Sequence, residues 1–327
     1  MMLLNKKQKV HFIIKDHVIR FVETTNATLK SIKVLGERYI PPGIIREGKI
    51  IERETLIMIL TEVVNDYKFR GRSVHFCVPD TYVVVRKINI PSDIPEDEIK
   101  GYLYLEMGES IHLPFEEPQF DYSVIGKTDL GTDIILVAAP RNVIEDYSSV
   151  LKEAKLKPIV ADLASLSLYR LIEGLKAVNT EDHLMCIEID IGSASVTVFH
   201  NGIPQFTRHQ KLNLDQELWK IVNNENESTI KWTGAMEDID MQIQELVTEL
   251  ERMMNFYRFS INHGRSGVTK ILLSGDNPDL LHIMEIIKND INLPVETVQE
   301  ELIQSQANKD IPIRFYELVG LALKKDI

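Results

Sequence analysis

The chain has 327 residues, of which 44% are hydrophobic, and 37 Lys and Arg stand against 49 Asp and Glu. This composition is typical of a globular protein with substantial cores, and it excludes a collagen, a disulfide miniprotein and a disordered tail. The formal net charge of -12 argues against a general nucleic-acid binder, because such proteins displace counterions from phosphates with Lys and Arg. The length favours roughly two or three domains.

The two cysteines, Cys77 and Cys186, lie far apart in apolar stretches, which indicates a reduced, cytosolic protein. The longest apolar runs are of strand length, and none approaches the roughly 20 residues that a membrane-spanning helix needs. The apolar opening of the chain is too short for the core of a signal peptide. Any membrane role is therefore expected to come through a partner.

The first ninety residues predict an α/β unit. Residues 10–14 and 18–23 are apolar runs around a short polar break, which predicts a hairpin, and residues 31–39 continue as extended chain. Apolar residues at three- and four-residue spacing then predict a helix over residues 56–67. The apolar period changes to two between residues 73 and 90, which predicts two further strands.

An αββα insert is predicted between residues 91 and 158. It comprises a helix that begins near Glu96, strands over residues 119–125 and 133–139, and a helix over residues 141–154. A short strand over residues 158–162 and an apolar-faced helix over residues 163–175 follow it.

The second half predicts a similar series of strands and helices. Strands are expected over residues 185–191, 195–200, 203–207, 270–273 and 295–298, and helices over residues 234–261, 280–290 and 315–325. Asn201-Gly202 between two strands is a strong hairpin signal, and residues 223–228 are expected to form a loop. The opening strand-turn-strand unit thus occurs twice, which predicts two α/β halves with a ligand cleft between them, as in sugar kinases and actin.

In that architecture the two hairpin turns face the phosphates of a nucleotide, because backbone N–H groups in a glycine-containing turn hydrogen-bond oxyanions. The second turn offers Asp190 to organise Mg²⁺, beside Gly192 and Ser193, although Asp-x-Gly is equally typical of a plain hairpin turn. The first turn has Ile13 where the acidic residue is expected and Lys15 where the glycine is expected. Lys15 would either offer its charge to a phosphate or lie solvated in the turn.

A third candidate element is Ser274-Gly275-Asp276, which follows a strand and precedes a helix. An adenosine would rest there in this architecture, and a simple strand-to-helix loop explains the same residues. Other chemistry has little support, because the chain has no His-Glu-x-x-His sequence, no Walker glycine loop and no Gly-x-Ser-x-Gly elbow.

Several short stretches occur in an order and spacing that together are specific for one family. They are Pro41-Pro42-Gly43, Glu98-Ile99 with Glu106, Leu113-Pro114-Phe115, Asp121-Tyr122, Leu156-Lys157-Pro158 with Asp162, Asp190-Ile191-Gly192, Glu251-Arg252, Ser274-Gly275 and Gly320-Leu321. Over nearly its whole length the chain resembles the PilM family of type IV pilus assembly proteins, relatives of the cell-division protein FtsA. The insert is the decisive feature, because it separates these proteins from actins and sugar kinases.

The resemblance implies an α/β, actin-like ATPase (RNase H-like) fold with two lobes. Residues 1–90 and 159–182 would form the first lobe (1A), residues 91–158 an αββα insert subdomain (1C, SHS2-like), and residues 183–327 the second lobe with its nucleotide-cleft region. The implied role is a cytoplasmic scaffold at the inner face of the membrane, in a type IV pilus or a related secretion or competence machine.

The implied partner is a PilN-type membrane protein, whose cytoplasmic N-terminal peptide would lie in a groove between the insert and the first lobe. The pilus assembly ATPase is a further candidate partner, and neither nucleic acid nor a membrane span is expected. The candidate lining residues of the groove are Ile99, Tyr102, Leu103, Glu106, Leu113 and Phe115.

The resemblance also implies a nucleotide site, in which ATP with Mg²⁺ would bind weakly or not at all. Its candidate residues are Asp190, Gly192, Ser193, Ser274, Gly275 and Lys15, with Asp190 as the candidate metal ligand. The departures at Ile13 and Lys15 predict no hydrolysis, so no catalytic residue is expected. Two alternatives stay open: an active ATPase or small-molecule kinase, indicated by the intact second turn, and an FtsA-like polymerising division protein.

Overall fold

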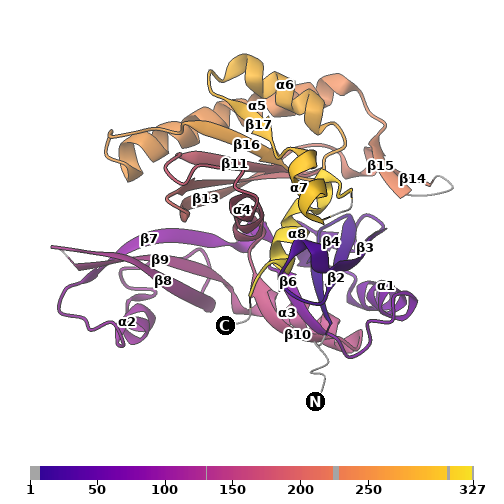
Figure 1. Cartoon of the computed structure of the whole chain (residues 1–327), viewed down its shortest axis with the longest axis horizontal. Helices are drawn as coiled ribbons and strands as arrows, with labels where there is room; N and C mark the ends of the chain where they lie inside the picture. The colour runs from indigo at the N-terminus through magenta and orange to yellow at the C-terminus, as the bar shows by residue number, and fades with distance from the viewer. Residues whose placement is uncertain (1–7, 130, 224–227, 308–309, 326–327) are drawn as a thin grey trace.

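The computed structural model describes residues 8–129, 131–223, 228–307 and 310–325. The loop expected over residues 223–228 therefore falls mostly outside the described residues. Two α/β lobes and a smaller insert surround a pair of central helices (Figure 1).

The first lobe is built on a five-stranded sheet with the order β10-β6-β1-β2-β3. These strands are β1 (Lys9–Ile14), β2 (Val18–Thr24), β3 (Ile32–Tyr39), β6 (Ser73–Cys77) and β10 (Lys157–Asp162). Strands β1, β2 and β3 form an antiparallel meander, and β6 runs parallel to both β1 and β10. The helices α1 (Arg53–Asp66) and α3 (Arg141–Glu153) pack on one face of this sheet over an apolar core, and the short strands β4 (Ile45–Arg46) and β5 (Lys49–Ile50) lie beside it.

The second lobe repeats this plan with the strand order β17-β16-β11-β12-β13. The strands are β11 (Leu184–Ile189), β12 (Ser193–His200), β13 (Ile203–Lys211), β16 (Lys270–Ser274) and β17 (Val295–Thr297). Its helices are α5 (Met236–Phe256), which continues into a π-helical turn over Tyr257–Ile261, and α6 (Leu280–Asp290). Because order and direction match those of the first lobe, the predicted duplication is confirmed.

The insert carries three strands and one helix, which differs from the predicted αββα unit. Strand β7 (Val84–Pro91) pairs along its length with β9 (Gly131–Pro140), which pairs with β8 (Pro118–Thr128), and α2 (Ile99–Glu106) covers the sheet. Residues 84–90, predicted for the first lobe, thus belong to the insert sheet. Helix α3, predicted for the insert, packs instead in the first-lobe core, because Tyr147, Val150 and Leu151 face α1 and its sheet.

Strand β7 also joins the insert to the second lobe. It pairs with the edge strand β13 through Arg86 and Phe206, so one eight-stranded sheet runs from β17 to β8. The insert therefore follows the first lobe in sequence and extends the second lobe in space.

Two helices lie between the lobes at the centre of Figure 1, namely α4 (Ala164–Gly174) and α8 (Tyr316–Ala322). Their apolar faces share a core with residues of both sheets. Helix α8 contacts β1, β2 and β6, so it packs on the first-lobe sheet, whereas all of residues 183–327 were predicted for the second lobe. The remaining elements are α7 (Glu300–Ala307) and a hairpin of β14 (Trp219–Asn223) with β15 (Ser228–Trp232).

Both cysteines are free and buried. Among the described residues no helix has the length and apolarity to cross a bilayer.

Candidate functional site

A cleft of about 440 Å³ lies between the lobes. The turn between β1 and β2 forms one wall, the turn between β11 and β12 forms the opposite wall, and the β14–β15 hairpin contributes Trp219 and Ile230. Both walls are hairpin turns because each lobe opens with the same strand-turn-strand unit. The duplicated sequence thus positions the two predicted phosphate turns across one cavity.

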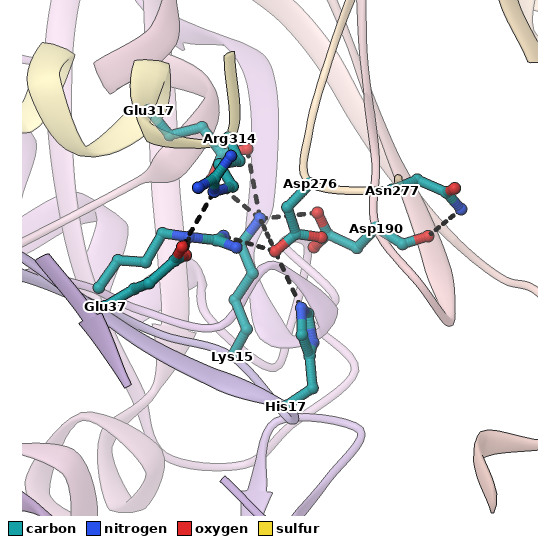
Figure 2. A network of polar contacts seen from close by, with 9 residues as sticks. Lys15, His17, Glu37, Asp190, Asp276, Asn277, Arg314 and Glu317 are labelled. Carbon is teal, nitrogen blue, oxygen red and sulfur yellow. Dashed lines mark hydrogen bonds and ion pairs between the residues drawn. The ribbon is translucent and has the colours of Figure 1, made fainter. Parts of the chain in front are cut away.

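Lys15 reaches from the first lobe into a cluster of carboxylates at the end of this cleft (Figure 2). Its Nζ atom lies 2.7 Å from Asp190 Oδ1, 3.1 Å from Glu317 Oε2 and 4.0 Å from Asp276 Oδ2. The side chain is only 14% exposed, so Lys15 is not the solvated turn lysine that was one of two expectations. Burial alone would lower the pKa of Lys15, but the three carboxylates outweigh it and hold that pKa well above its ordinary value.

Asp276 is the acidic centre of the same network, and its side chain is fully buried. Its Oδ2 atom accepts hydrogen bonds from Arg20 Nη1 at 2.5 Å and from His17 Nε2 at 3.0 Å. Burial would raise the pKa of Asp276, but His17, Lys15 and Arg20 together hold it well below its usual range. Asp276 is therefore a permanent anion that draws three first-lobe side chains toward the second lobe.

Glu37 and Arg314 extend the network away from the cleft. Glu37 accepts from Arg20 Nε at 2.9 Å and from Arg314 Nε at 3.0 Å, and the ring of Phe315 lies under both guanidinium groups. Charged groups from β2, β3, the loop after β16 and the start of α8 thus meet at one point. Since each buried charge has a partner of opposite sign, the arrangement holds the lobes and α8 together.

These residues do not fit a magnesium ion. Asp190, the candidate metal ligand, already has the Lys15 ammonium at contact distance, and that ammonium would repel a second cation. Within the described part of the chain, no group of three or more His, Cys, Asp or Glu side chains is placed to hold a metal. The acidic position predicted at Ile13 is occupied by Lys15, because Lys15 N bonds Val18 O in the first hairpin as Asp190 N bonds Ser193 O in the second. Ile13 is buried in the core.

The other predicted nucleotide residues divide into two groups. Gly192 and Ser193 line the cleft beside Asp190 and Lys15, whereas Ser274 and Gly275 do not line it. Ser274 is fully buried at the end of β16. Gly275 has φ +121° and packs so closely on the backbone of Ile189 that an added Cβ would lie 2.2 Å from the Ile189 carbonyl oxygen.

Gly275 allows the loop after β16 to pack closely against the turn that carries Asp190. The next residues continue this contact, because Asn277 donates its backbone N–H to Ile189 O at 3.1 Å and its side-chain Nδ2 to Asp190 O at 3.3 Å (Figure 2). The loop after β16 thereby fixes the position of Asp190.

Replacing Gly275 with alanine is expected to lower the free energy of unfolding by about 3 kcal/mol, because the left-handed backbone and the backbone clash act together. Urea unfolding followed by circular dichroism measures this loss. Gly192→Ala is the matched control, since Gly192 has no positive φ and an added Cβ would meet only Gln216 Nε2 at 3.5 Å. Equal stability of the two variants would contradict the assigned role of Gly275.

A second hollow, a groove of about 700 Å³, lies between the first lobe and the loop that precedes β8. Its walls are the segment 114–117 of the insert, the first turns of α3 and the β5 region, and its lining includes Tyr82, Phe115, Val143 and Ile50. Tyr147 donates its hydroxyl hydrogen bond to Gly48 O at 3.0 Å, and Asp16 accepts from the backbone N–H groups of Glu47 and Gly48. These bonds fix the β4–β5 wall of the groove to α3 and to the first hairpin.

Of the six predicted groove residues, Phe115 lines this groove and the other five do not. Ile99 and Leu103 are fully buried in the insert core, and Tyr102 and Leu113 pack against that core. Glu106 accepts a hydrogen bond from Ser110 in the turn after α2. Their position has a simple cause, because α2 covers the insert sheet with its apolar face and the loop after α2 meets the first lobe.

The sequence analysis missed the charged network around Lys15 and the α3 wall of the groove. Arg20 and Glu317 carried a usable signal, because each is a charged residue within an otherwise apolar run. No such signal was available for Asn142, Val143 and Asp146, because α3 was predicted to belong to the insert.

Fold and cleft together define a protein of the actin-like class with an inserted subdomain and a lysine among carboxylates in its cleft. A family model described as type IV pilus assembly protein PilM matches residues 14–314. The chain therefore belongs to the PilM family of type IV pilus assembly proteins, and the predicted resemblance is confirmed.

Solved structures give the same fold. The PilM-PilN type IV pilus biogenesis complex matches with a TM-score of 0.73 and 19% identity, over 96% of this chain and 97% of that chain. The ethanolamine utilization protein EutJ from Carboxydothermus hydrogenoformans matches with a TM-score of 0.50 and 10% identity, over 97% and 89% of the two chains. No curated protein matches the chain in sequence.

Proposed function

We propose that this chain is a non-enzymatic scaffold of pilus assembly that binds the cytoplasmic N-terminal segment of a PilN-type membrane protein in the 700 Å³ groove. The observation that carries the proposal is this groove between the insert loop and the first lobe, in a member of the PilM family. The solved PilM that matches this chain is named as a complex with PilN. A scaffold held by such a partner would lie at the inner face of the membrane.

The lining of the groove supports an extended, partly basic segment. Tyr82, Phe115 and Val143 offer apolar contacts, and exposed Glu116, Glu117 and Asp146 outnumber the single base Lys49. Cytoplasmic segments beside a membrane span carry an excess of Lys and Arg. The charge of the groove therefore complements the expected partner, and the apolar contacts would supply the specificity.

The cleft supports a scaffold without ATP turnover. Asp190 is bound by Lys15, and neither Ile13 nor Lys15 can position a metal or an attacking water. An active ATPase or kinase would need side chains that position a metal and an attacking water. A scaffold is therefore the function that the geometry supports best.

A labelled peptide of the cognate PilN N-terminus tests the proposal by fluorescence anisotropy. Wild-type protein is expected to bind it, and Phe115→Ala and Asp146→Lys are each expected to weaken binding by roughly tenfold or more, because each removes a wall contact or reverses its charge.

Two neighbours serve as matched controls. Glu145→Lys changes the same charge one residue away on α3, outside the groove lining, and Leu105→Ala removes an exposed apolar side chain of α2. Both controls are expected to bind as wild type does. Absence of binding, or equal loss in Glu145→Lys and Asp146→Lys, would refute the groove as the partner site, and phosphate release from ATP would refute the non-enzymatic role.

A further inference from the structure

The cleft brings three carboxylates from three separate elements around one ammonium group. Asp190 lies in the turn after β11, Asp276 in the loop after β16, and Glu317 in the first turn of α8. Lys15 Nζ is within 4.0 Å of an oxygen of each. The Lys15 ammonium donates hydrogen bonds to Asp190 and Glu317, and it forms a longer ion pair with Asp276.

The charges of this network come within one unit of balance only when Lys15 is included. Asp190, Asp276, Glu317 and Glu37 contribute four carboxylates, and Lys15, Arg20 and Arg314 contribute three permanent cations, with His17 beside them. Without Lys15, two cations would face four largely buried carboxylates. A buried carboxylate that lacks a counter-charge destabilises the fold or takes up a proton. Burial and the neighbouring Asp276 raise the pKa of Asp190, and the Lys15 ammonium opposes this, so a cation is required here to keep the cluster ionised.

The required cation comes from the chain itself. Magnesium prefers six oxygen ligands at about 2.0–2.1 Å in octahedral geometry, and among the described residues no group of three or more His, Cys, Asp or Glu side chains is placed to hold a metal. Lys15 lies in the turn between β1 and β2. In the duplicated fold this turn is the counterpart of the turn between β11 and β12, which carries Asp190. The two turns therefore meet as a cation and an anion across the cleft, at 2.7 Å.

We propose that the Lys15 ammonium is the resident cation of this cleft: it takes the place of a divalent metal as counter-ion to Asp190, Asp276 and Glu317, and it excludes metal-bound nucleotide. Closure of the two lobes is then a permanent property of the chain and is not gated by a ligand. Asp16 of the same first hairpin holds one wall of the groove through Glu47 and Gly48. A fixed closure of the lobes therefore also fixes the shape of the groove.

The first test uses the wild-type chain alone. Its melting temperature is expected to be unchanged by EDTA, by millimolar Mg²⁺ and by millimolar ATP with Mg²⁺. A ligand that binds the folded state and not the unfolded state raises the melting temperature, because it adds RT ln(1 + [L]/Kd) to the free energy of unfolding. A rise with Mg²⁺ or with ATP and Mg²⁺ would overturn the proposal, and this arm needs no variant to fold.

The second test removes the charge. Lys15→Met is expected to lower the melting temperature by roughly 5–10 °C and to raise hydrogen exchange at the amides of residues 13–17 and 189–193 by about tenfold or more, with α1 unaffected. Lys152→Met is the control, because Lys152 is an exposed lysine of α3 outside the cleft. The double variant Lys15→Met with Asp190→Asn is expected to recover part of the loss, since it removes one of the uncompensated carboxylates.

Exchange at the two turns that is equal in Lys15→Met and wild type, or a double variant no more stable than the single one, would overturn the proposal. Peptide binding in the groove is measured separately, so failure of the resident cation and failure of the scaffold role can be told apart.

Discussion

Replacing Gly320 with alanine is expected to lower the melting temperature by roughly 6–12 °C, which corresponds to about 3 kcal/mol or more. Gly320 lies where α8 crosses α4, and an added Cβ would stand 1.8 Å from the carbonyl oxygen of Ser167. The obstacle is backbone inside a helix, so no side-chain rotation can relieve it. The two helices must separate, and the core that they share with both sheets must open.

The same substitution should reach the cleft, because Glu317 lies one turn before Gly320 on α8. Differential scanning calorimetry measures the stability loss, and Gly174→Ala on α4 is the matched control. Gly174 is helical with nothing within 4 Å of an added Cβ, so alanine there is expected to leave stability unchanged or slightly higher. A Gly320→Ala protein as stable as Gly174→Ala would show that the α4–α8 crossing tolerates wider spacing.

Much of the fold is predictable because its signals are local. A few neighbouring residues are enough to predict the apolar face of α5, the Asn201-Gly202 turn and the two opening hairpins. Element type along the chain was therefore predicted well, and the repeated hairpin was enough to predict two α/β halves, whose shared strand order the structure then shows.

Element partners were less predictable, because packing over long sequence separations leaves little local signal. The alternation of apolar residues in β7 would be the same whether it paired with β6 or with β9. In the structure β7 pairs with β9, and both strands place apolar residues on the same face of the insert sheet. The helical period of α3 likewise does not say which sheet its apolar face meets. Helix α8 returns to the first lobe through contacts that no short motif encodes.

In the candidate site, too, local features were predictable and long-range contacts were not. Lys15 and Asp190 were predictable as turn residues, because each lies in a hairpin of recognisable pattern. That they bind each other was not predictable from spacing, since 175 residues separate them. The prediction that Lys15 takes the place of a glycine was wrong, because the registers of the two hairpins match Lys15 with Asp190 and His17 with Gly192. The role of Lys15 as a counter-charge required Glu317 and Asp276 in three dimensions.

Replacing Arg20 with methionine is expected to lower the free energy of unfolding by about 3–5 kcal/mol, because it removes one partner of a buried charge network. The Arg20 side chain is 2% exposed on β2, where it bridges Asp276 at 2.5 Å and Glu37 at 2.9 Å. Methionine keeps the apolar volume and contributes no charge, so the loss reports the unpaired carboxylates and not a cavity. Urea unfolding at neutral pH measures it.

Arg38→Met is the matched control on the neighbouring strand β3, because Arg38 pairs with Asp66 at 3.0 Å while both side chains remain exposed. An exposed ion pair contributes about 0–1 kcal/mol, so this variant should stay close to wild type. Adding Asp276→Asn to Arg20→Met should restore part of the stability, since the buried anion is then removed together with its cation. If the double variant is as unstable as the sum of the two single variants, Arg20 and Asp276 do not act as a pair and the network does not join the lobes.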